Sequence, residues 1–329
     1  MTDEPFDRGA ERQVVALRIA SSSPGSREGI IDEYARRSEA AFSPETLRNY
    51  RQICRMFEQW CSSMGYRSTP PVSPSIVAQY VDFLGGRVKP STIEVRLWAI
   101  GEMHLRMLHP SPCRNRLVNL ALKAVKRTYG AAVRQAPALG KTEIIATIES
   151  LGGSRIDVRD KAVLWIATDS WCRASELCAF KVKDLELQAD GSSLLYVSRS
   201  KTDPYGAGAY AFLSSDGTHA VLDWIKLAGL RRDDPIVTKS QVGAKRTPLD
   251  PATISRIFKR CTGRPDVSAH STRVGGVQDA FRIGCDLSSI MVAGRWSSPE
   301  MPARYGRRIL ASQSAAAKVS EAFGRSRAT

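Results

Sequence analysis

Several features that define other classes of protein are absent from the sequence. No apolar run approaches the length that crosses a bilayer, and the first thirty residues are charged and contain no apolar signal-peptide core. The seven cysteines form no Cys-x-x-Cys pair and their number is odd, so we expect neither a disulfide framework nor a zinc site. We interpret them as buried small apolar residues in a reducing environment. A cytoplasmic protein without a membrane role is therefore expected.

Cofactor-binding patterns are missing as well. The chain contains neither a glycine-rich nucleotide-binding loop nor a cluster of carboxylates for a metal ion. We therefore expect chemistry that uses no cofactor and only the protein's own side chains.

Acidic residues are too few to balance the basic ones. Lysine and arginine number 48 against 33 acidic residues, which gives a net charge of +15 over 329 residues. An excess of this size favours a polyanionic partner, most simply the DNA backbone. The alternative is a basic but inert solvated surface. The length suits two domains, each able to bury its own core.

Residues suited to phosphate chemistry gather near the C-terminus, where His270, Arg273, Trp296 and Tyr305 follow one another. The planar guanidinium of Arg273 fits two non-bridging phosphate oxygens, and Arg173 is the candidate for a second such fork. These donors would stabilise the charge of a pentacovalent transition state. A tyrosine hydroxyl, with a pKa of about 10, becomes a good nucleophile when a base such as His270 accepts its proton.

Each of these residues also has an ordinary structural interpretation. The His-x-x-Arg spacing is common in surface helix pairs, Tyr305 alone suits half-buried packing, and Trp296 suits a core anchor whose N–H meets a carbonyl. Only the combination is specific.

That combination resembles the tyrosine recombinases of the phage integrase family. The matching residues are Arg173 and Glu176 in Trp-Cys-Arg-Ala-Ser-Glu-Leu, Lys201 in Ser-Arg-Ser-Lys-Thr, His270 and Arg273 in His-Ser-Thr-Arg-Val-Gly, Trp296, and Tyr305. The resemblance extends from about residue 40 to the C-terminal helix. Most members carry a second histidine where this sequence has Trp296.

The resemblance implies a site-specific DNA recombinase that needs neither ATP nor a metal. Tyr305 would attack the scissile phosphodiester and form a 3′-phosphotyrosine, with Arg173 and Arg273 on the non-bridging oxygens. His270 would assist proton transfer, and Lys201 would protonate the 5′ hydroxyl. Trp296 would donate to an oxygen or pack the pocket.

Two further points concern the same residues. Glu176 is three residues from Arg173 on one helical face, and it would orient Arg173 or Lys201 or form a plain surface ion pair. Arg295 stands where relatives usually carry glycine, so we expect the loop before Trp296 to differ. Pro299 and Pro302 crowd the segment that leads to Tyr305.

The resemblance also implies how the protein assembles. A homodimer would bind double-stranded DNA at an inverted-repeat site, and two sites would meet in a homotetramer that exchanges strands through a Holliday junction. A C-terminal helix over residues 311–323 would dock into a neighbouring subunit, the alternative being packing onto its own domain. The implied setting is a prokaryotic, phage or plasmid-encoded protein associated with the nucleoid.

We predict a mainly α fold with a small β-sheet in two domains. Residues 1–38 are predicted to be a flexible segment and residues 39–133 an all-helical, core-binding (SAM-like) domain. A linker at residues 134–139 leads to an α+β catalytic domain at residues 140–329. By resemblance the two domains form a C-shaped clamp on DNA.

Local patterns place the elements of both domains. Caps at Ser43-Pro44 and Ser73-Pro74 open helices, and further helices are predicted over 76–84, 93–108, 114–129, 141–151, 159–169, 218–230, 251–261, 271–284 and 287–293, with one starting near residue 174. Strands are predicted at 194–198 and 209–213, with a turn at 203–206 and Lys201 at the exposed end of this hairpin.

Basic residues of the helical domain are the candidate DNA contacts, or else a solvated basic face. We select Arg48, Arg51, Arg87, Lys89, Arg106 and Lys123. Two other functions remain open: a type IB topoisomerase that swivels one strand, and a DNA-binding protein whose catalytic site has decayed.

Overall fold

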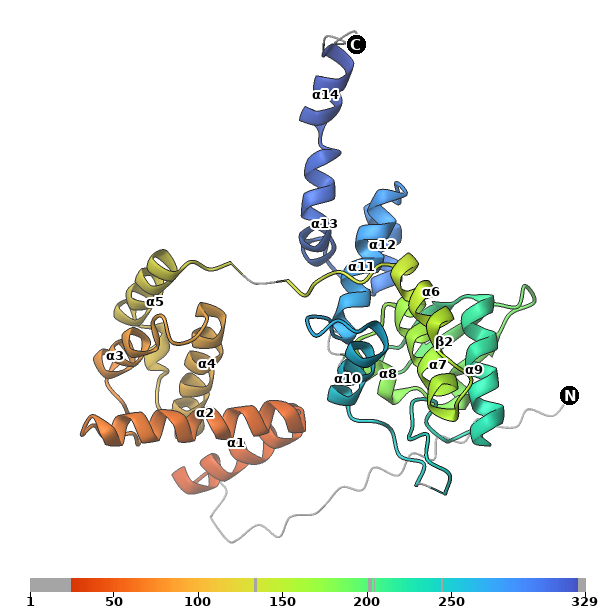
Figure 1. Ribbon diagram of the computed structural model, residues 1–329. Helices are drawn as coiled ribbons and strands as arrows, with labels where there is room; N and C mark the ends of the chain where they lie inside the picture. Colours follow the sequence, from red (N-terminus) through yellow and green to blue (C-terminus); the bar gives the residue numbers. More distant parts are fainter. Residues whose placement is uncertain (1–24, 133–134, 201–202, 204, 244, 325–329) are drawn as a thin grey trace, which may run out of the picture. The chain divides into compact units, whose positions relative to one another are not determined.

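The computed structural model describes residues 25–132, 135–200, 203, 205–243 and 245–324. The chain divides into two compact units, residues 1–133 and 134–329, so the division falls where the predicted linker begins. Figure 1 shows helices in both units and a small sheet in the second, which confirms the predicted fold class.

The first unit consists of helices throughout its described residues. They are α1 (Arg27–Ala41), α2 (Pro44–Ser63), α3 (Pro74–Leu84), α4 (Pro90–Arg106) and α5 (Arg116–Tyr129), with a 3₁₀ turn at Pro112–Arg114. Proline opens α2, α3 and α4, because the first helical N–H has no partner to lose. The rings of Phe57, Trp60 and Tyr80 pack together in the core.

One prediction for this unit is wrong. The segment predicted to be flexible up to residue 38 forms α1 from Arg27 onward, capped by the Ser26 side chain, which accepts from the Gly29 amide. Ser38 is buried and donates to Glu102 of α4 at 3.4 Å. The helix has no continuous apolar stripe, so the periodicity gave no signal. Residues 1–24 of that segment lie outside the described residues.

The second unit mixes helices with a three-stranded sheet. Its helices are α6 (Lys141–Ser150), α7 (Arg155–Ser170), α8 (Ala174–Ala179), α9 (Ser215–Ala228), α10 (Pro251–Thr262), α11 (Ala269–Arg282), α12 (Leu287–Gly294), α13 (Glu300–Ser312) and α14 (Ala315–Phe323). A 3₁₀ turn at Val182–Asp184 precedes β1 (Leu185–Leu187), and β2 (Ser193–Val197) and β3 (Ala209–Leu213) complete an antiparallel sheet of order β1-β2-β3. The predicted β2–β3 hairpin is confirmed, whereas the three-residue β1 was not predicted.

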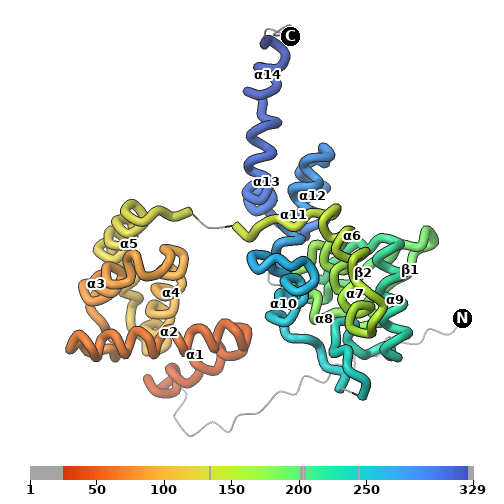
Figure 2. The backbone as a smooth tube through the Cα atoms, viewed as in Figure 1, coloured from red at the N-terminus to blue at the C-terminus, as the bar shows by residue number. Residues whose placement is uncertain are grey.

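Helix α7 is the centre of this unit. Every residue from Ala162 to Ala167 is buried, as expected of a helix covered on all sides. It packs on α9, β3 and α11 (Figure 2). Its C-terminal end therefore lies inside the unit, and the segment carrying Arg173 follows directly from it.

Two boundaries matter for the site. Helix α11 begins at Ala269, two residues before the predicted start, so Arg273 lies beyond the first turn. The predicted C-terminal helix is divided, because α13 ends at Ser312 and α14 begins at Ala315. No helix in the described part of the chain is long and apolar enough to pass through a bilayer.

Candidate active site

The predicted nucleophile and base are in direct contact. Tyr305, on α13, is buried, and its Oη lies 2.8 Å from Nε2 of His270 in the first turn of α11. The backbone amide of His270 donates to Ser268, the N-cap of α11, which fixes the start of the helix. Helices α11 and α13 pack on one another, so the two side chains are held by rigid elements.

The protonation states of this pair suit proton transfer from tyrosine to histidine. Burial lowers the pKa of the His270 imidazole, and the charges of Arg273 and Arg173 lower it further. Burial raises the pKa of the Tyr305 hydroxyl, although the charges of Arg273 and Arg173 act in the opposite direction. At neutral pH the imidazole is therefore neutral and the hydroxyl protonated. An unprotonated Nε2 accepts the hydrogen bond from Oη and is placed to accept the proton.

Arg273 is fixed by two backbone carbonyls. Its Nη1 donates to the Trp171 carbonyl and its Nη2 to the Gly294 carbonyl, and the residue is 1% exposed. Burial lowers the pKa of Arg273 to about 10, with contributions from the charges of Arg173 and Arg295, so the group stays charged at neutral pH. These two bonds leave other guanidinium N–H groups for an anion.

Trp296 packs between Arg273 and Tyr305. The Arg273 Cζ lies 4.1 Å from the centroid of the indole, a cation–π contact. The phenol ring of Tyr305 meets the same indole edge-on at 5.9 Å. Gly294 leaves room for the indole, because a Cβ there would be 1.7 Å from Cζ3 of Trp296. The indole therefore packs against both the Arg273 guanidinium and the Tyr305 phenol.

Arg173, whose side chain is 21% exposed, forms an ion pair with the buried Glu176. Arg173 Nη1 donates to Glu176 Oε1 at 2.7 Å, and the Arg173 amide donates to Oε2 at 3.0 Å. Burial alone would raise the pKa of the Glu176 carboxyl, but the hydrogen bonds from Arg173 and the charges of Arg173 and Arg295 bring it below its ordinary value. The open alternative of a surface pair is therefore excluded, since Glu176 is 3% exposed.

Lys201 lies outside the described residues, so the structure gives it no position. Further along the chain, the Asp203 carboxylate accepts from the amides of Gly206, Ala207 and Gly208 at 2.9–3.0 Å.

Two contributors were not predicted from the sequence. Trp171, which holds Arg273 through its carbonyl, adopts a left-handed backbone conformation with φ 49°. Arg295 was noted only as a departure from glycine, yet its guanidinium reaches Glu176. A sequence signal for Arg295 was present, because relatives usually carry glycine at this position and glycine is the residue that best tolerates a positive φ.

The candidate DNA contacts of the first unit divide into two groups. Arg48, Arg51, Arg87, Lys89 and Lys123 are exposed. Arg106 is not, because its guanidinium packs 4.4 Å over the Tyr50 ring and pairs with Glu102, leaving 16% of the side chain exposed. We therefore assign Arg106 to the packing of this unit and no longer to the DNA-binding set.

Comparison with known proteins places these observations in a family. Residues 141–309, more than half of the chain, match the family described as the phage integrase family. The chain belongs to the phage integrase family. The matched segment contains the site residues described above. The predicted resemblance to tyrosine recombinases is thereby confirmed.

Relatives within the family cover most of the chain. The recombinase Cre of Escherichia phage P1 is 28% identical over 320 residues, 89% of this chain and 92% of its own length. An integrase/recombinase XerD homologue of Selenomonas ruminantium is 27% identical over 82% of this chain and 83% of its own. The fold is similar to that of the XerH site-specific recombinase bound to a palindromic difH substrate, with a TM-score of 0.63 at 15% identity over 90% of this chain and 85% of that one.

Proposed function

We propose that this tyrosine recombinase cleaves and rejoins DNA at short inverted-repeat sites through a 3′-phosphotyrosine and a Holliday junction. The observation that carries the proposal is the contact between Tyr305 Oη and His270 Nε2 at 2.8 Å, beside Arg273. A packing tyrosine needs no neutral base and no buried guanidinium next to its hydroxyl. The relatives named as recombinases support the same function.

The proposed cleavage uses two proton transfers, one from the Tyr305 hydroxyl to His270 and one to the departing 5′ oxygen. His270 Nε2 accepts the phenolic proton as Tyr305 Oη bonds to phosphorus, and the bond from phosphorus to the 5′ oxygen breaks. Arg173 and Arg273 neutralise the charge on the non-bridging oxygens, which is where the transition state gains it. The departing 5′ oxygen receives a proton, for which Lys201 is the proposed donor. Attack by a 5′ hydroxyl of another strand reverses these steps and releases Tyr305.

The first unit is proposed as the DNA-binding module. Its exposed candidates, Arg48, Arg51, Arg87, Lys89 and Lys123, suit contacts to phosphates, which position a protein on DNA without reading its sequence. Two of them are paired on the surface, Arg48 with Glu45 and Arg51 with Glu39, and such exposed pairs are weak enough to be exchanged for phosphates.

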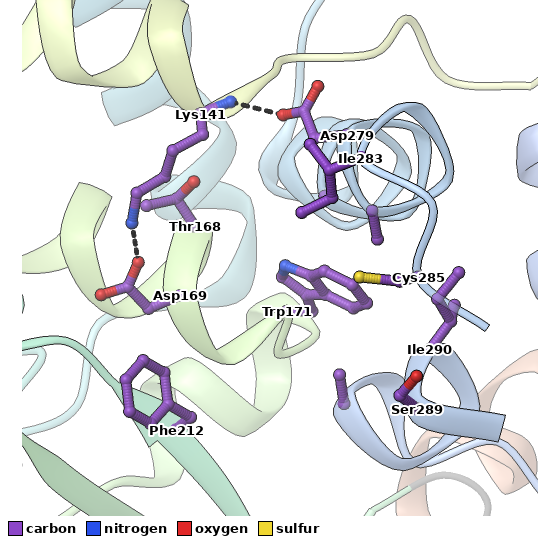
Figure 3. A pocket seen from close by; sticks show the side chains of 13 residues that line it. Lys141, Thr168, Asp169, Trp171, Phe212, Asp279, Ile283, Cys285, Ser289 and Ile290 are labelled. Carbon is purple, nitrogen blue, oxygen red and sulfur yellow. Dashed lines mark hydrogen bonds and ion pairs between the residues drawn. The ribbon is translucent and has the colours of Figure 1, made fainter. Parts of the chain in front are cut away.

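Assembly through the C-terminus is supported by an unpacked helix and an apolar cavity in the second unit. No residue of α14 is buried, and its Val319 and Phe323 are 57% and 85% exposed. A cavity of about 400 Å³ opens near α7, α11 and α12, lined by Trp171, Phe212, Ile283, Cys285 and Ile290 among others (Figure 3). At its rim the Lys141 amide donates to Asp279 Oδ2 at 2.7 Å.

The proposed occupant of this cavity is α14 of a second copy. Exposed apolar side chains on a short helix gain free energy when they leave water, and an apolar cavity on the same chain provides the surface. Because donor helix and acceptor cavity are different surfaces of one subunit, the contact is head-to-tail, and such contacts can close into a ring. This supports a closed assembly of subunits, such as the proposed tetramer, in place of packing of α14 onto its own subunit.

Trapping the covalent intermediate tests the proposed function. The protein would be incubated, without metal, with inverted-repeat DNA from its own genomic neighbourhood, nicked just beyond candidate cleavage points. We expect an SDS-resistant protein–DNA adduct that is absent for Tyr305→Phe, while Tyr305→Phe binds the same DNA equally well. Tight binding without an adduct on any site would contradict the proposal and indicate a DNA-binding protein with a decayed active site.

A further inference from the structure

Arg295 occupies a backbone position that disfavours arginine. It follows the last residue of α12 with φ 55° and ψ 48°, in the left-handed region. The turn is fixed, because the Arg295 amide donates to the Val292 carbonyl at 3.1 Å and the Trp296 amide to the Met291 carbonyl at 3.0 Å. The presence of arginine at this position indicates that the contacts of its side chain offset the free-energy cost of the left-handed backbone conformation.

The guanidinium of Arg295 is buried in the active site. The side chain is 9% exposed and donates through Nη1 to the Ser170 carbonyl at 3.0 Å and the Ala293 carbonyl at 3.2 Å. Nη2 lies 3.2 Å from both Cys172 Sγ and Glu176 Oε2. Its buried Nε has no hydrogen-bond partner among the residues that the structure describes.

Glu176 is thereby shared by the guanidinium groups of two arginines, one on each carboxylate oxygen, while the Arg173 amide also donates to Oε2. Arg173 Nη1 binds Oε1 at 2.7 Å, whereas Arg295 Nη2 binds Oε2 at 3.2 Å. A single carboxylate next to a single guanidinium would compensate its charge and hold it away from a phosphate. A second guanidinium on the same carboxylate leaves Arg173 with uncompensated positive charge in a largely buried site, where charge interactions are stronger than in water.

We infer that Arg295 is a positioning residue of this recombinase: it is the second counter-ion of Glu176 and keeps Arg173 oriented and electrostatically free for the scissile phosphate. Arg295 itself donates to backbone carbonyls, a thiol and a carboxylate, so it acts through Glu176 without touching DNA. The inference rests on the proposed roles of Arg173 and Tyr305.

Arg295→Gly is the informative variant, because glycine adopts this backbone conformation without strain and removes only the side chain. At saturating nicked DNA we expect the single-turnover rate of adduct formation to fall roughly 10- to 100-fold, the scale of effect from displaced catalytic groups. The affinity for DNA, measured in a Tyr305→Phe background, should stay unchanged. Arg295→Lys keeps the charge and should recover part of the rate.

Combining Arg295→Gly with Glu176→Gln separates positioning from a general structural role. If Arg295 acts through the carboxylate, its removal should have little further effect once the charge of Glu176 is gone, so the two changes should be strongly non-additive. Arg246→Gly is the matched control, since Arg246 also pairs with an acid, Asp234 at 2.6 Å, in the same unit. Its rate should equal that of the unchanged protein.

The outcomes distinguish this inference from the function on which it rests. Full adduct formation by the unchanged chain together with an unaltered rate for Arg295→Gly would overturn the role of Arg295 alone. So would an equal loss of rate from Arg295→Gly in the presence and absence of the Glu176 carboxylate. Failure of the unchanged chain to form any adduct would overturn the proposed function and the inference with it.

Discussion

At the scale of single residues, burial and the charges of Arg273 and Arg173 together determine the acid–base properties of the Tyr305–His270 pair. The two positive charges lower the pKa of the His270 imidazole and oppose the effect of burial on the Tyr305 hydroxyl. The arginine charges therefore help to keep the imidazole unprotonated as an acceptor, and they make loss of the phenolic proton less costly than burial alone would. The anionic phosphate would then enter a site in which positive charge is already in place, which is the arrangement that stabilises a transition state without reorganisation.

The pH dependence of cleavage tests the role of His270. Because the pKa of the imidazole lies below its ordinary value of 6.5, the base stays unprotonated down to that pH. We expect the rate of adduct formation to be flat above pH 6.5 and to fall as the pH decreases through the lowered pKa. Single-turnover rates at saturating DNA between about pH 5 and pH 8 would show this.

A histidine replacement serves as the control for that profile. His270→Gln should reduce the rate on the order of 10²- to 10⁴-fold, the range for loss of a general base. Its remaining rate should lose the decrease below pH 6.5. An unchanged acidic decrease in His270→Gln would assign that titration to another group.

The candidate catalytic residues were predictable because short motifs contain them, whereas their surroundings were not. His270, Arg273 and Arg173 occur in recognisable segments, and the structure places them together. The role of Arg295 depends on a left-handed backbone angle and on a partner, Glu176, that is 119 positions away in the sequence. Local patterns contain neither. Arg106 was wrongly selected as a DNA contact, since its charge alone does not reveal that its guanidinium packs on the Tyr50 ring.

At the scale of elements, α11 carries both His270 and Arg273. It packs so closely against its neighbours that two of its positions leave no space for a side chain. A Cβ on Gly275 would lie 2.0 Å from the Leu139 carbonyl oxygen, and one on Gly276 would lie 2.2 Å from Nε1 of Trp171. The Leu139 amide also donates to the Ser271 carbonyl at 3.0 Å. The Gly-Gly step in α11 is therefore explained by close packing.

Gly276→Ala tests this packing. The added methyl group would displace Trp171, whose carbonyl holds Arg273, so both stability and catalysis should decrease. We expect a loss of about 1–3 kcal/mol in the free energy of unfolding, as for overpacked cores. Denaturant unfolding would measure the first effect and adduct formation the second.

Gly153→Ala is the matched control for that change. A Cβ at Gly153 would meet no atom within 4 Å, and its backbone is not in the left-handed region. Stability and adduct formation should both stay close to those of the unchanged protein. Equal behaviour of the two alanine variants would contradict the packing account of α11.

Element boundaries show which sequence signals are strong. The caps and prolines at Ser43 and Ser73 placed the first helices well, because they act within one turn. Helix α1 was missed since it has no continuous apolar stripe, and β1 was missed since three residues are too few to show alternation.

At the scale of the whole molecule, the proposed exchange of α14 between subunits explains why a terminal helix keeps Val319 and Phe323 in water. The same contact would link the active sites, because α14 follows α13, which carries Tyr305. Movement of α14 on docking would then reach the nucleophile through one helix and a two-residue break.

Phe323→Asp tests the assembly. A charge on this side chain should prevent burial in an apolar cavity, so the DNA complex should stop at the dimer while adduct formation on a single site continues. Light scattering of the complexes separated by size would distinguish dimer from tetramer. Ile283→Asp, at the cavity, should give the same result.

Val242→Asp is the control, because Val242 is equally exposed at 85% and lies in the same unit. It should leave the tetramer intact. Tetramers of normal stability with both Phe323→Asp and Ile283→Asp would show that subunits meet through another surface.

The central claim is that Tyr305 is the covalent nucleophile. The most direct measurement is to trap the adduct on a nicked site, digest the DNA and the protein, and locate the attached nucleotide by mass spectrometry. The account predicts a 3′-linked nucleotide on the peptide that contains Tyr305, and a free 5′ hydroxyl on the other side of the break. A nucleotide on any other residue, or a 5′-linked one, would contradict it.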